Sequence, residues 1–356
     1  MQIKELKLIN YRNFKKLDLT FAKTNFFYGL NGVGKTNIVE AIAYLTNLSS
    51  FRYVSDDDLI NKESSFFTIE ATFKQQETSY VVKVVNSFDS KKVYIDDKEI
   101  RKKQDYLSQF ITVCFTPQDV FLFKDSKNKR REFLNDEIMK ISPVYYVSLN
   151  NFNKLLKTRN DYLKKENIDR TLLDVYTSLI AKYSYEIMLK RYQFIHQLEY
   201  YTNIKYHELS GSNDEITIEY DTFLKENELT IENILKKYHE SLNEDLNKKV
   251  SNIGIQKDDF TLYINHQKMA NYGSQGQNRL ASIAIKLAMI EIASLKTGDR
   301  PIVILDDVFS ELDSEKQKNL LRHLQNESQI FLTMAHKVKS DEGKIYFVSN
   351  SGVKEE

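Results

Sequence analysis

The stretch that decides the fold is Gly29-Leu30-Asn31-Gly32-Val33-Gly34-Lys35-Thr36. It fits the pattern G-x-x-x-x-G-K-[ST], which is typical of loops that bind the phosphates of a nucleotide. Its glycines let successive backbone N–H groups turn inward around an anion. We therefore expect the whole loop to contact a nucleotide, with Lys35 reaching the β- and γ-phosphates and the Thr36 hydroxyl holding Mg²⁺.

The residues on either side of this loop supply the strand and the helix that it needs. Residues 25–28 form a short apolar run before it, which predicts a buried strand. After the loop, apolar residues recur at helical spacing, so the N-terminus of a helix would face the anion. These residues are Ile38, Val39, Ile42 and Leu45. The context favours a nucleotide loop over a glycine-rich turn that matches by chance.

A second segment, residues 301–307, is an apolar run that ends in two carboxylates, Asp306 and Asp307. A continuous apolar run suits the centre of a parallel sheet, where both faces are covered. Ligands of such sheets bind beyond the carboxyl ends of the strands. We therefore expect Asp306 to hold Mg²⁺ and Asp307 to orient or deprotonate an attacking water.

Three further positions are candidates for the same site. Ser274 and Gln277 belong to Ser274-Gln275-Gly276-Gln277, which precedes an apolar helical pattern and predicts an anion-binding helix start or, alternatively, an ordinary helix cap. Gln118 follows the apolar run 111–115 and is expected at the metal, with a plain turn glutamine as the alternative. Arg12, in a turn before the loop, is expected either to approach the nucleotide or to be a solvated turn arginine.

The order of these motifs describes an ABC-type ATPase head. The phosphate loop comes first, then the serine–glycine cap, and then the acidic strand with the trailing loop Ser310-Glu311-Leu312-Asp313. In that class the serine of the cap contacts the γ-phosphate that the opposite protomer holds. We therefore expect Ser274 to act in trans, so that ATP joins two copies of the chain.

Apolar patterning divides the rest of the chain. Residues 66–115 contain alternating runs typical of β-strands, whereas heptad-like seams through residues 144–166 and 170–204 predict an antiparallel helical pair. The expected fold class is α/β, an ABC-ATPase-like P-loop head with a mixed parallel sheet, an antiparallel β subdomain and an inserted helical lobe. The expected divisions are 1–118 and 206–356 for the two halves of the head and 119–205 for the helical lobe.

Composition limits the class of protein. The chain has 356 residues with 51 basic and 50 acidic side chains, so net charge is no argument for a nucleic-acid partner. Its one cysteine, Cys114, excludes a disulfide framework and fits a reducing compartment. Because no apolar run approaches the roughly 20 residues of a membrane span, we expect a cytoplasmic protein with no membrane partner.

A local cluster of basic residues opens the predicted helical lobe. It is a candidate for contact with DNA phosphates, and a solvated helical face is the alternative. No base-reading motif is visible, so we expect recognition of shape or of a junction. The cluster consists of Lys124, Lys127, Lys129, Arg130 and Arg131.

Several segments, taken together and in order, carry a family resemblance. They are Asn10-Tyr11-Arg12-Asn13-Phe14, the phosphate loop running into Glu40-Ala41-Ile42, Ser50-Phe51-Arg52, Phe115-Thr116-Pro117-Gln118-Asp119, Lys129-Arg130-Arg131-Glu132-Phe133-Leu134, Ser274-Gln275-Gly276-Gln277 and Leu305-Asp306-Asp307-Val308-Phe309. With them the chain resembles the RecF family of bacterial DNA replication and repair proteins over nearly its whole length. One departure is Gly254-Ile255-Gln256-Lys257-Asp258-Asp259, where the family usually has Gly-Pro-His-Arg-Asp-Asp.

The resemblance implies more than the residues show by themselves. It implies ATP and Mg²⁺ as cofactors, slow DNA-stimulated ATP hydrolysis and an ATP-dependent homodimer on single-stranded and duplex DNA at gaps or junctions. It also implies a role with RecO and RecR in loading RecA. The alternative is a nucleotide-binding subunit of another ABC-type assembly, such as a transporter or another SMC-like ATPase.

Overall fold

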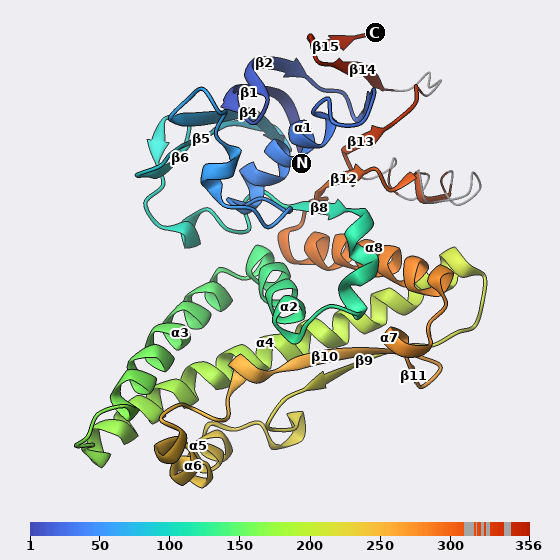
Figure 1. Ribbon diagram of the computed structural model, residues 1–356. Helices are drawn as coiled ribbons and strands as arrows, with labels where there is room; N and C mark the ends of the chain where they lie inside the picture. Colours follow the sequence, from blue (N-terminus) through green and yellow to red (C-terminus); the bar gives the residue numbers. More distant parts are fainter. Residues whose placement is uncertain (310–316, 318, 322–323, 325–327, 338–342) are drawn as a thin grey trace. The chain divides into compact units, whose positions relative to one another are not determined.

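The computed structural model describes residues 1–356 apart from 310–316, 318, 322–323, 325–327 and 338–342. The described residues form two compact units (Figure 1). The first unit comprises Met1–Val120 and Lys286–Glu356, and the second comprises Phe121–Ile285. The expected trailing loop Ser310-Glu311-Leu312-Asp313 lies outside the described residues.

A six-stranded sheet in the first unit carries the phosphate loop, which joins β3 (Thr24–Tyr28) to α1 (Lys35–Asn47). Neighbouring strands are parallel except for the pair β14–β15. Every residue of β8, β12 and β13 is buried, as expected for strands covered on both faces. The strand order is β15 (Gly352–Glu355), β14 (Lys344–Ser349), β3, β13 (Ile330–Met334), β12 (Ile302–Asp306) and β8 (Thr112–Phe115).

A second sheet of the first unit is antiparallel. Its strands alternate buried and exposed residues, so that one face packs on the core and the other faces water. Asp96 and Asp97 form the turn between β6 and β7, and both have the positive φ that tight hairpin turns require. The strand order is β2 (Phe14–Thr20), β1 (Gln2–Tyr11), β4 (Phe66–Gln75), β5 (Thr78–Ser87), β6 (Lys91–Ile95) and β7 (Lys98–Glu99).

Helix α1 contacts both sheets, which explains why most of its residues are buried. Its apolar side chains join those of the two sheets in one core, together with rings such as Tyr44 and Phe67, whose centroids lie 5.6 Å apart. The start of α1, and with it the phosphate loop, is therefore anchored by the burial of most of the helix.

The second unit is built on the predicted helical pair, which is confirmed as α3 (Pro143–Leu163) and α4 (Arg170–Ser210), side by side in Figure 1. Ser142 accepts a hydrogen bond from the N–H of Tyr145 and Pro143 occupies the first turn, so the start of α3 is well capped. Asp169 caps α4 in the same way, and Gly211 ends it in the left-handed region. At 41 residues, α4 is about 60 Å long.

The second unit is larger than the helical lobe of residues 119–205 that the patterning predicts. It continues to Ile285 because β9 packs against α4 and β10 packs against α2, so these strands fold with the helices. Helix α8 (Gln275–Thr297) contains the boundary between the units. The remaining elements are α2 (Lys127–Ile141), β9 (Ile216–Asp221), α5 (Ile231–Glu240), α6 (Leu242–Lys248), β10 (Asp259–Ile264), β11 (Gln267–Lys268) and α7 (Met269–Tyr272).

No described helix combines the length and the apolarity needed to cross a bilayer.

The buried face of α4 carries a polar row beside its apolar seam. Thr177, Ser184 and Arg191 recur every seven residues and are all buried. Each has a partner from another element: Thr177 with Arg159, Ser184 with Tyr238, and Arg191 with Asp258. The apolar seam lies four residues before each of these positions, at Leu173, Ile180 and Ile187, and continues to Phe194.

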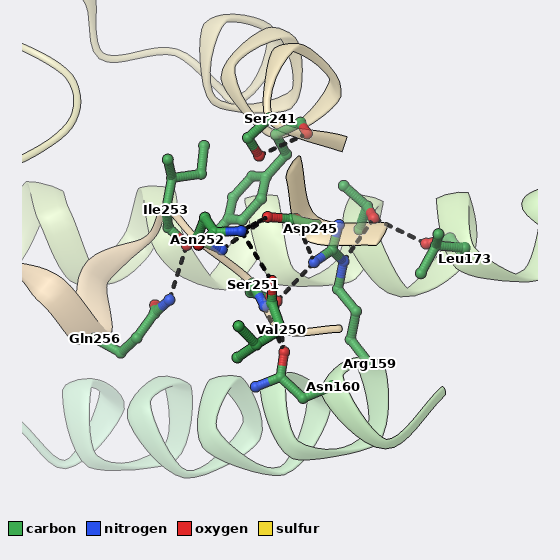
Figure 2. Close-up of polar contacts among 12 residues, drawn as sticks. Arg159, Asn160, Leu173, Ser241, Asp245, Val250, Ser251, Asn252, Ile253 and Gln256 are labelled. Carbon is green, nitrogen blue, oxygen red and sulfur yellow. Dashed lines mark hydrogen bonds and ion pairs between the residues drawn. The ribbon is translucent and has the colours of Figure 1, made fainter. Parts of the chain in front are cut away.

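Arg159 of α3 lies at the centre of one buried polar cluster (Figure 2). Its guanidinium donates to Asp245 (2.8 Å), Ser251 (2.6 Å) and Thr177 (3.2 Å). Asp245 also accepts a hydrogen bond from the backbone N–H of Asn252 at 2.7 Å. Neither charged side chain of this pair is exposed, so the pair ties the segment that follows α5 to the helical pair.

Arg191 forms a second buried cluster in the same unit. It donates to Asp258 (2.6 Å), the carbonyl of Ile255 (3.0 Å), the hydroxyl of Tyr145 (3.0 Å) and Asn135 (2.9 Å). Burial raises the pKa of Asp258, and the charge of Arg191 opposes that rise. Asp258 belongs to residues 254–259, the segment that differs from the usual family sequence. Its contacts here are those of a structural carboxylate.

Arg159→Met should lower the free energy of unfolding of the chain by about 3–5 kcal/mol, because it leaves Asp245 buried without its countercharge. Urea denaturation followed by circular dichroism measures this loss. Lys157→Met, at an exposed position of the same helix, is the matched control and should change stability by less than about 0.5 kcal/mol. The pair has no such role if Arg159→Met behaves like that control, or if adding Asp245→Asn recovers none of the loss.

Candidate nucleotide-binding site

Lys35 links the end of the phosphate loop to its beginning through hydrogen bonds. The ammonium of Lys35 donates to the carbonyls of Gly29 and Leu30, both at 2.8 Å, across the loop from the first turn of α1. Burial lowers the pKa of Lys35, and the charges of Asp307 and Asp306 oppose this. The ammonium thus lies where the N–H groups of the loop and the start of α1 would meet phosphate oxygens.

Gly29 and Gly32 are required for different reasons. Gly32 has φ +83°, which favours glycine, and no described atom lies within 4 Å of the position that a Cβ would take. A Cβ on Gly29 would overlap the backbone carbonyl of Val348 in β14. The loop therefore passes too close to a neighbouring strand for any side chain at residue 29.

The turn between β1 and β2 supports the loop from outside. Asn13 donates to the carbonyl of Val33 (3.1 Å) and accepts a hydrogen bond from Asn37 of α1 (2.8 Å). The turn belongs to the segment 10–14 that carries the family resemblance, but the sequence alone gives Asn13 no role.

The acidic strand meets the phosphate loop through Asp306. Its Oδ1 accepts hydrogen bonds from the hydroxyls of Thr36 (2.9 Å) and Thr333 (2.7 Å). Burial raises the pKa of Asp306, and these two hydrogen bonds oppose the rise. The predicted neighbourhood of Thr36 and Asp306 is thus present, although the two residues are 270 positions apart.

Asp307 follows directly and differs in environment. Its side chain is exposed, and its φ of 54° places it in the left-handed region, which is uncommon for a residue with a Cβ. The N–H of Asp307 donates to the hydroxyl of Thr333 at 2.9 Å. Thr333 therefore contacts both carboxylate residues, and no pattern in the sequence singles it out.

The donor set at Thr36 and Asp306 fits a magnesium ion. A hydroxyl has one proton and two lone pairs, so Thr36 can donate to Asp306 and still offer an oxygen to a cation. Mg²⁺ at nucleotide sites takes one or two carboxylates, water and phosphate oxygens, not a cage of protein ligands. No cluster of three or more histidine, cysteine or carboxylate side chains is found within the described parts of the chain.

Gln118, the third expected metal ligand, follows β8, whose last residue Phe115 pairs with Leu305 of β12. Its side chain is exposed to solvent. The turn that carries it is held by Asp119, which accepts a hydrogen bond from the N–H of Thr116 (2.6 Å) and pairs with Lys286 (2.9 Å). Gln118 thus remains a predicted ligand on a well-anchored turn.

Arg12 is paired with a carboxylate of α1, and its approach to a nucleotide stays a prediction. Its guanidinium makes a two-point contact with Glu40 of α1, at 2.9 and 2.8 Å, and donates to the carbonyl of Asp58 at 3.2 Å. Glu40 is fully buried, and Arg52 also lies 3.9 Å from it. Glu40 is a charged residue in a helix that is otherwise largely apolar, a signal that could have revealed this pairing.

Ser274 and Gln277 form a reciprocal cap at the start of α8. The N–H of Ser274 donates to Oε1 of Gln277 (3.0 Å), and the N–H of Gln277 donates to Oγ of Ser274 (3.2 Å). Ser274, Gln275 and Gly276 are exposed, so the cap presents the start of a long helix to solvent. The predicted helix cap is confirmed, whereas its contact with nucleotide stays a prediction.

The basic cluster at and just before the start of α2 divides into two groups. Arg130 makes a two-point contact with Asp259 (2.7 and 2.6 Å), and Arg131 donates to the carbonyl of Asp258 (2.7 Å). Arg130 therefore attaches α2 to the strand β10, and Arg131 attaches it to the residue before that strand. The exposed members of the cluster are Lys124, Lys127 and Lys129.

The fold and the site define a class of protein, the P-loop nucleotide-binding heads of the SMC type. A family model described as the RecF/RecN/SMC N terminal domain matches residues 2–351. An SMC head domain bound to the C-winged helix domain of ScpA shares the fold alone, with a TM-score of 0.55 at 16% identity. The chain belongs to the RecF family, as its sequence motifs indicate.

Two curated relatives and two solved structures carry this assignment. The DNA replication and repair protein RecF of Clostridioides difficile (strain 630) is 36% identical, covering 97% of this chain and 95% of the relative. That of Bacillus subtilis (strain 168) is 35% identical, covering 94% and 93%. A structure described as the recombination mediator protein RecF-ATP in the RecFOR pathway matches with a TM-score of 0.92, 29% identity and coverage of 99% and 97%. The RecF-ATPrS structure matches with a TM-score of 0.91, 28% identity and coverage of 99% and 98%.

Gly29→Ala should destabilise the first unit more than Gly32→Ala. Both substitutions place a Cβ on a backbone with positive φ, which costs about 1–2 kcal/mol. Gly29→Ala must also displace the backbone of β14, which should add about 1–3 kcal/mol. Thermal unfolding of the two variants beside the wild type measures the difference, and equal losses of stability would contradict the predicted overlap with Val348.

Proposed function

We propose that this chain is an ATP-dependent DNA-binding switch of the RecF type, acting in recombinational repair and replication. The observation that carries the proposal is the hydrogen bond between Thr36 and Asp306, which joins the phosphate loop to the acidic strand. This arrangement occurs in a chain that aligns with RecF proteins over almost its whole length. ATP as the nucleotide is supported by the similar solved structure described as RecF-ATP.

The residues of the first unit have separate tasks in this proposal. The loop N–H groups and Lys35 would hold the β- and γ-phosphates, with Lys35 exchanging its bonds to the loop carbonyls for phosphate oxygens. Thr36, Asp306 and Gln118 would hold Mg²⁺, which would neutralise phosphate charge. Catalysis of phosphoryl transfer is mostly positioning and electrostatic stabilisation, so these fixed groups supply most of it.

Asp307 is the proposed group that orients and deprotonates the attacking water. Its exposed side chain at the end of β12 can reach a solvent molecule, unlike that of the buried Asp306. Two adjacent carboxylates in different environments suit two roles, one at the metal and one at the water.

Dimerisation is the proposed consequence of ATP binding. Ser274 is exposed at the start of α8, where backbone N–H groups favour an anion, and would contact the γ-phosphate that a second copy holds. ATP would then hold two copies together, and its slow, DNA-stimulated hydrolysis would release them. By family resemblance the closed dimer would act at single-strand gaps or junctions with RecO and RecR in loading RecA.

Asp307→Asn should leave nucleotide binding intact and lower ATP turnover about 100-fold or more, because the amide cannot accept the proton of the water. Asparagine tolerates the left-handed backbone of residue 307, so the loop should keep its shape. Light scattering after gel filtration with ATP and Mg²⁺, on gapped and on intact duplex, should show a longer-lived dimer than that of the wild type.

The control for this dimer is the double variant Asp307→Asn with Ser274→Arg. It should bind ATP but stay monomeric, since the arginine occupies the surface that would meet the second nucleotide. A wild-type protein that stays monomeric with saturating ATP and Mg²⁺, with or without DNA, would overturn the proposed function.

Neutralising Lys124, Lys127 and Lys129 to Gln should weaken DNA binding and its dependence on salt. Each phosphate contact contributes about 0.9 to the slope of log K against log[salt], so the slope should fall by as much as about 2.7. Arg130 and Arg131 are left in place because they attach α2 to β10 and to the residue before it. Fluorescence anisotropy of labelled gapped duplex at several salt concentrations measures both quantities.

The matched control neutralises Lys92, Lys98 and Lys102, three exposed lysines of the antiparallel sheet and the segment after it. It changes net charge equally and should leave the slope near that of the wild type. If both triple variants lower the slope to the same extent, Lys124, Lys127 and Lys129 form no specific part of the DNA footprint.

A further inference from the structure

Thr333 occupies a central place among the strands of the site. It lies on β13, where it pairs with Asp306 of β12 on one side and with Phe27 of β3 on the other. β3 leads into the phosphate loop, so Thr333 lies between the strand that ends at the loop and the strand that ends at the carboxylates. Its side chain is only 2% exposed.

The hydroxyl of Thr333 makes two hydrogen bonds of opposite direction. It donates to Oδ1 of Asp306 at 2.7 Å and accepts the N–H of Asp307 at 2.9 Å. One hydroxyl can do both because it has one proton and two lone pairs. A single side chain is therefore bonded to the carboxylate of one aspartate and to the backbone of the next.

The hydrogen bond from the N–H of Asp307 holds a residue whose backbone conformation is unfavourable. Asp307 has φ 54°, and a residue with a Cβ stays in the left-handed region only where its surroundings hold it. The bond from its N–H to Thr333 fixes the peptide plane that precedes its Cα. The direction in which the carboxylate of Asp307 leaves the strand depends on that plane.

We infer that Thr333 is a positioning residue for hydrolysis, which acts by holding the backbone of Asp307 so that its carboxylate faces the attacking water. The inference rests on the proposed role of Asp307 and adds to it the group that sets its geometry. Thr333 touches neither nucleotide nor water in this scheme. Its loss should therefore lower turnover without lowering affinity for ATP to the same extent.

Thr333→Val is the discriminating substitution, because valine keeps the β-branched shape and removes only the hydroxyl. Turnover should fall about 10- to 100-fold, the range for losing buried hydrogen bonds at a charged group. The dissociation constant for a fluorescent ATP analogue should change less than about threefold, within the effect of one weak contact. The ATP-bound dimer should live longer, as in Asp307→Asn.

Thr333→Ser restores the hydroxyl and should recover most of the turnover. The matched control is Thr112→Val, on β8 of the same sheet, which also removes a buried hydroxyl, one that is bonded to Thr46 at 2.6 Å. Thr112→Val should lower stability about as much as Thr333→Val does, but it should keep wild-type turnover. If the loss of turnover came only from lost stability, both valine variants would show it.

Two outcomes would overturn the inference. One is wild-type turnover in Thr333→Val, and the other is equal loss of turnover in Thr333→Val and Thr112→Val. Either result leaves the proposed function standing if the wild type hydrolyses ATP and dimerises. A wild type that neither binds ATP nor dimerises with it would instead overturn the proposed function, on which the role of Thr333 rests.

Discussion

The carboxylate of Asp306 is the constraint on which the nucleotide site depends. It accepts hydrogen bonds from Thr36 at the start of α1 and from Thr333 on β13, and so joins three segments that are far apart in the chain. A buried carboxylate is costly unless such donors meet it, and this cost makes the arrangement of the three segments specific. The parallel sheet brings them together, because β3, β13 and β12 are neighbours and end at the same edge.

The core of the second unit also contains buried charged side chains that need partners. Arg159 with Asp245, and Arg191 with Asp258, are ion pairs whose members are at most 2% exposed. A buried pair adds little stability compared with apolar packing, but it penalises every arrangement that separates its members. The pairs therefore favour one docking of the segments after α5 and before β10 onto the helical pair. We expect these charges to contribute to the specificity of packing more than to stability.

The site was predictable where its chemistry lies in neighbouring residues, and not where partners are distant. The phosphate loop, the acidic strand and the cap at Ser274 are patterns of adjacent residues, and all three elements form as expected. The partners of charged side chains were not predictable in this way. Arg12 pairs with Glu40, and Arg130 pairs with Asp259, which is 129 positions away. Thr333 was not predictable, because a threonine in an apolar strand is common and the sequence does not show that its hydroxyl lies between two aspartates.

By itself, the sequence determined the elements and the family, since glycine positions, helical spacing and apolar runs act over a few residues. It specified a P-loop head, an antiparallel helical pair with seams through residues 144–166 and 170–204, and a strand ending at two carboxylates. Only the tertiary structure decided that the second unit continues to Ile285, and that Thr177, Ser184 and Arg191 of α4 form a buried polar row. The reason is physical. A buried polar side chain needs a hydrogen-bonding or ionic partner, and that partner is a neighbour in space, which local sequence patterns do not specify.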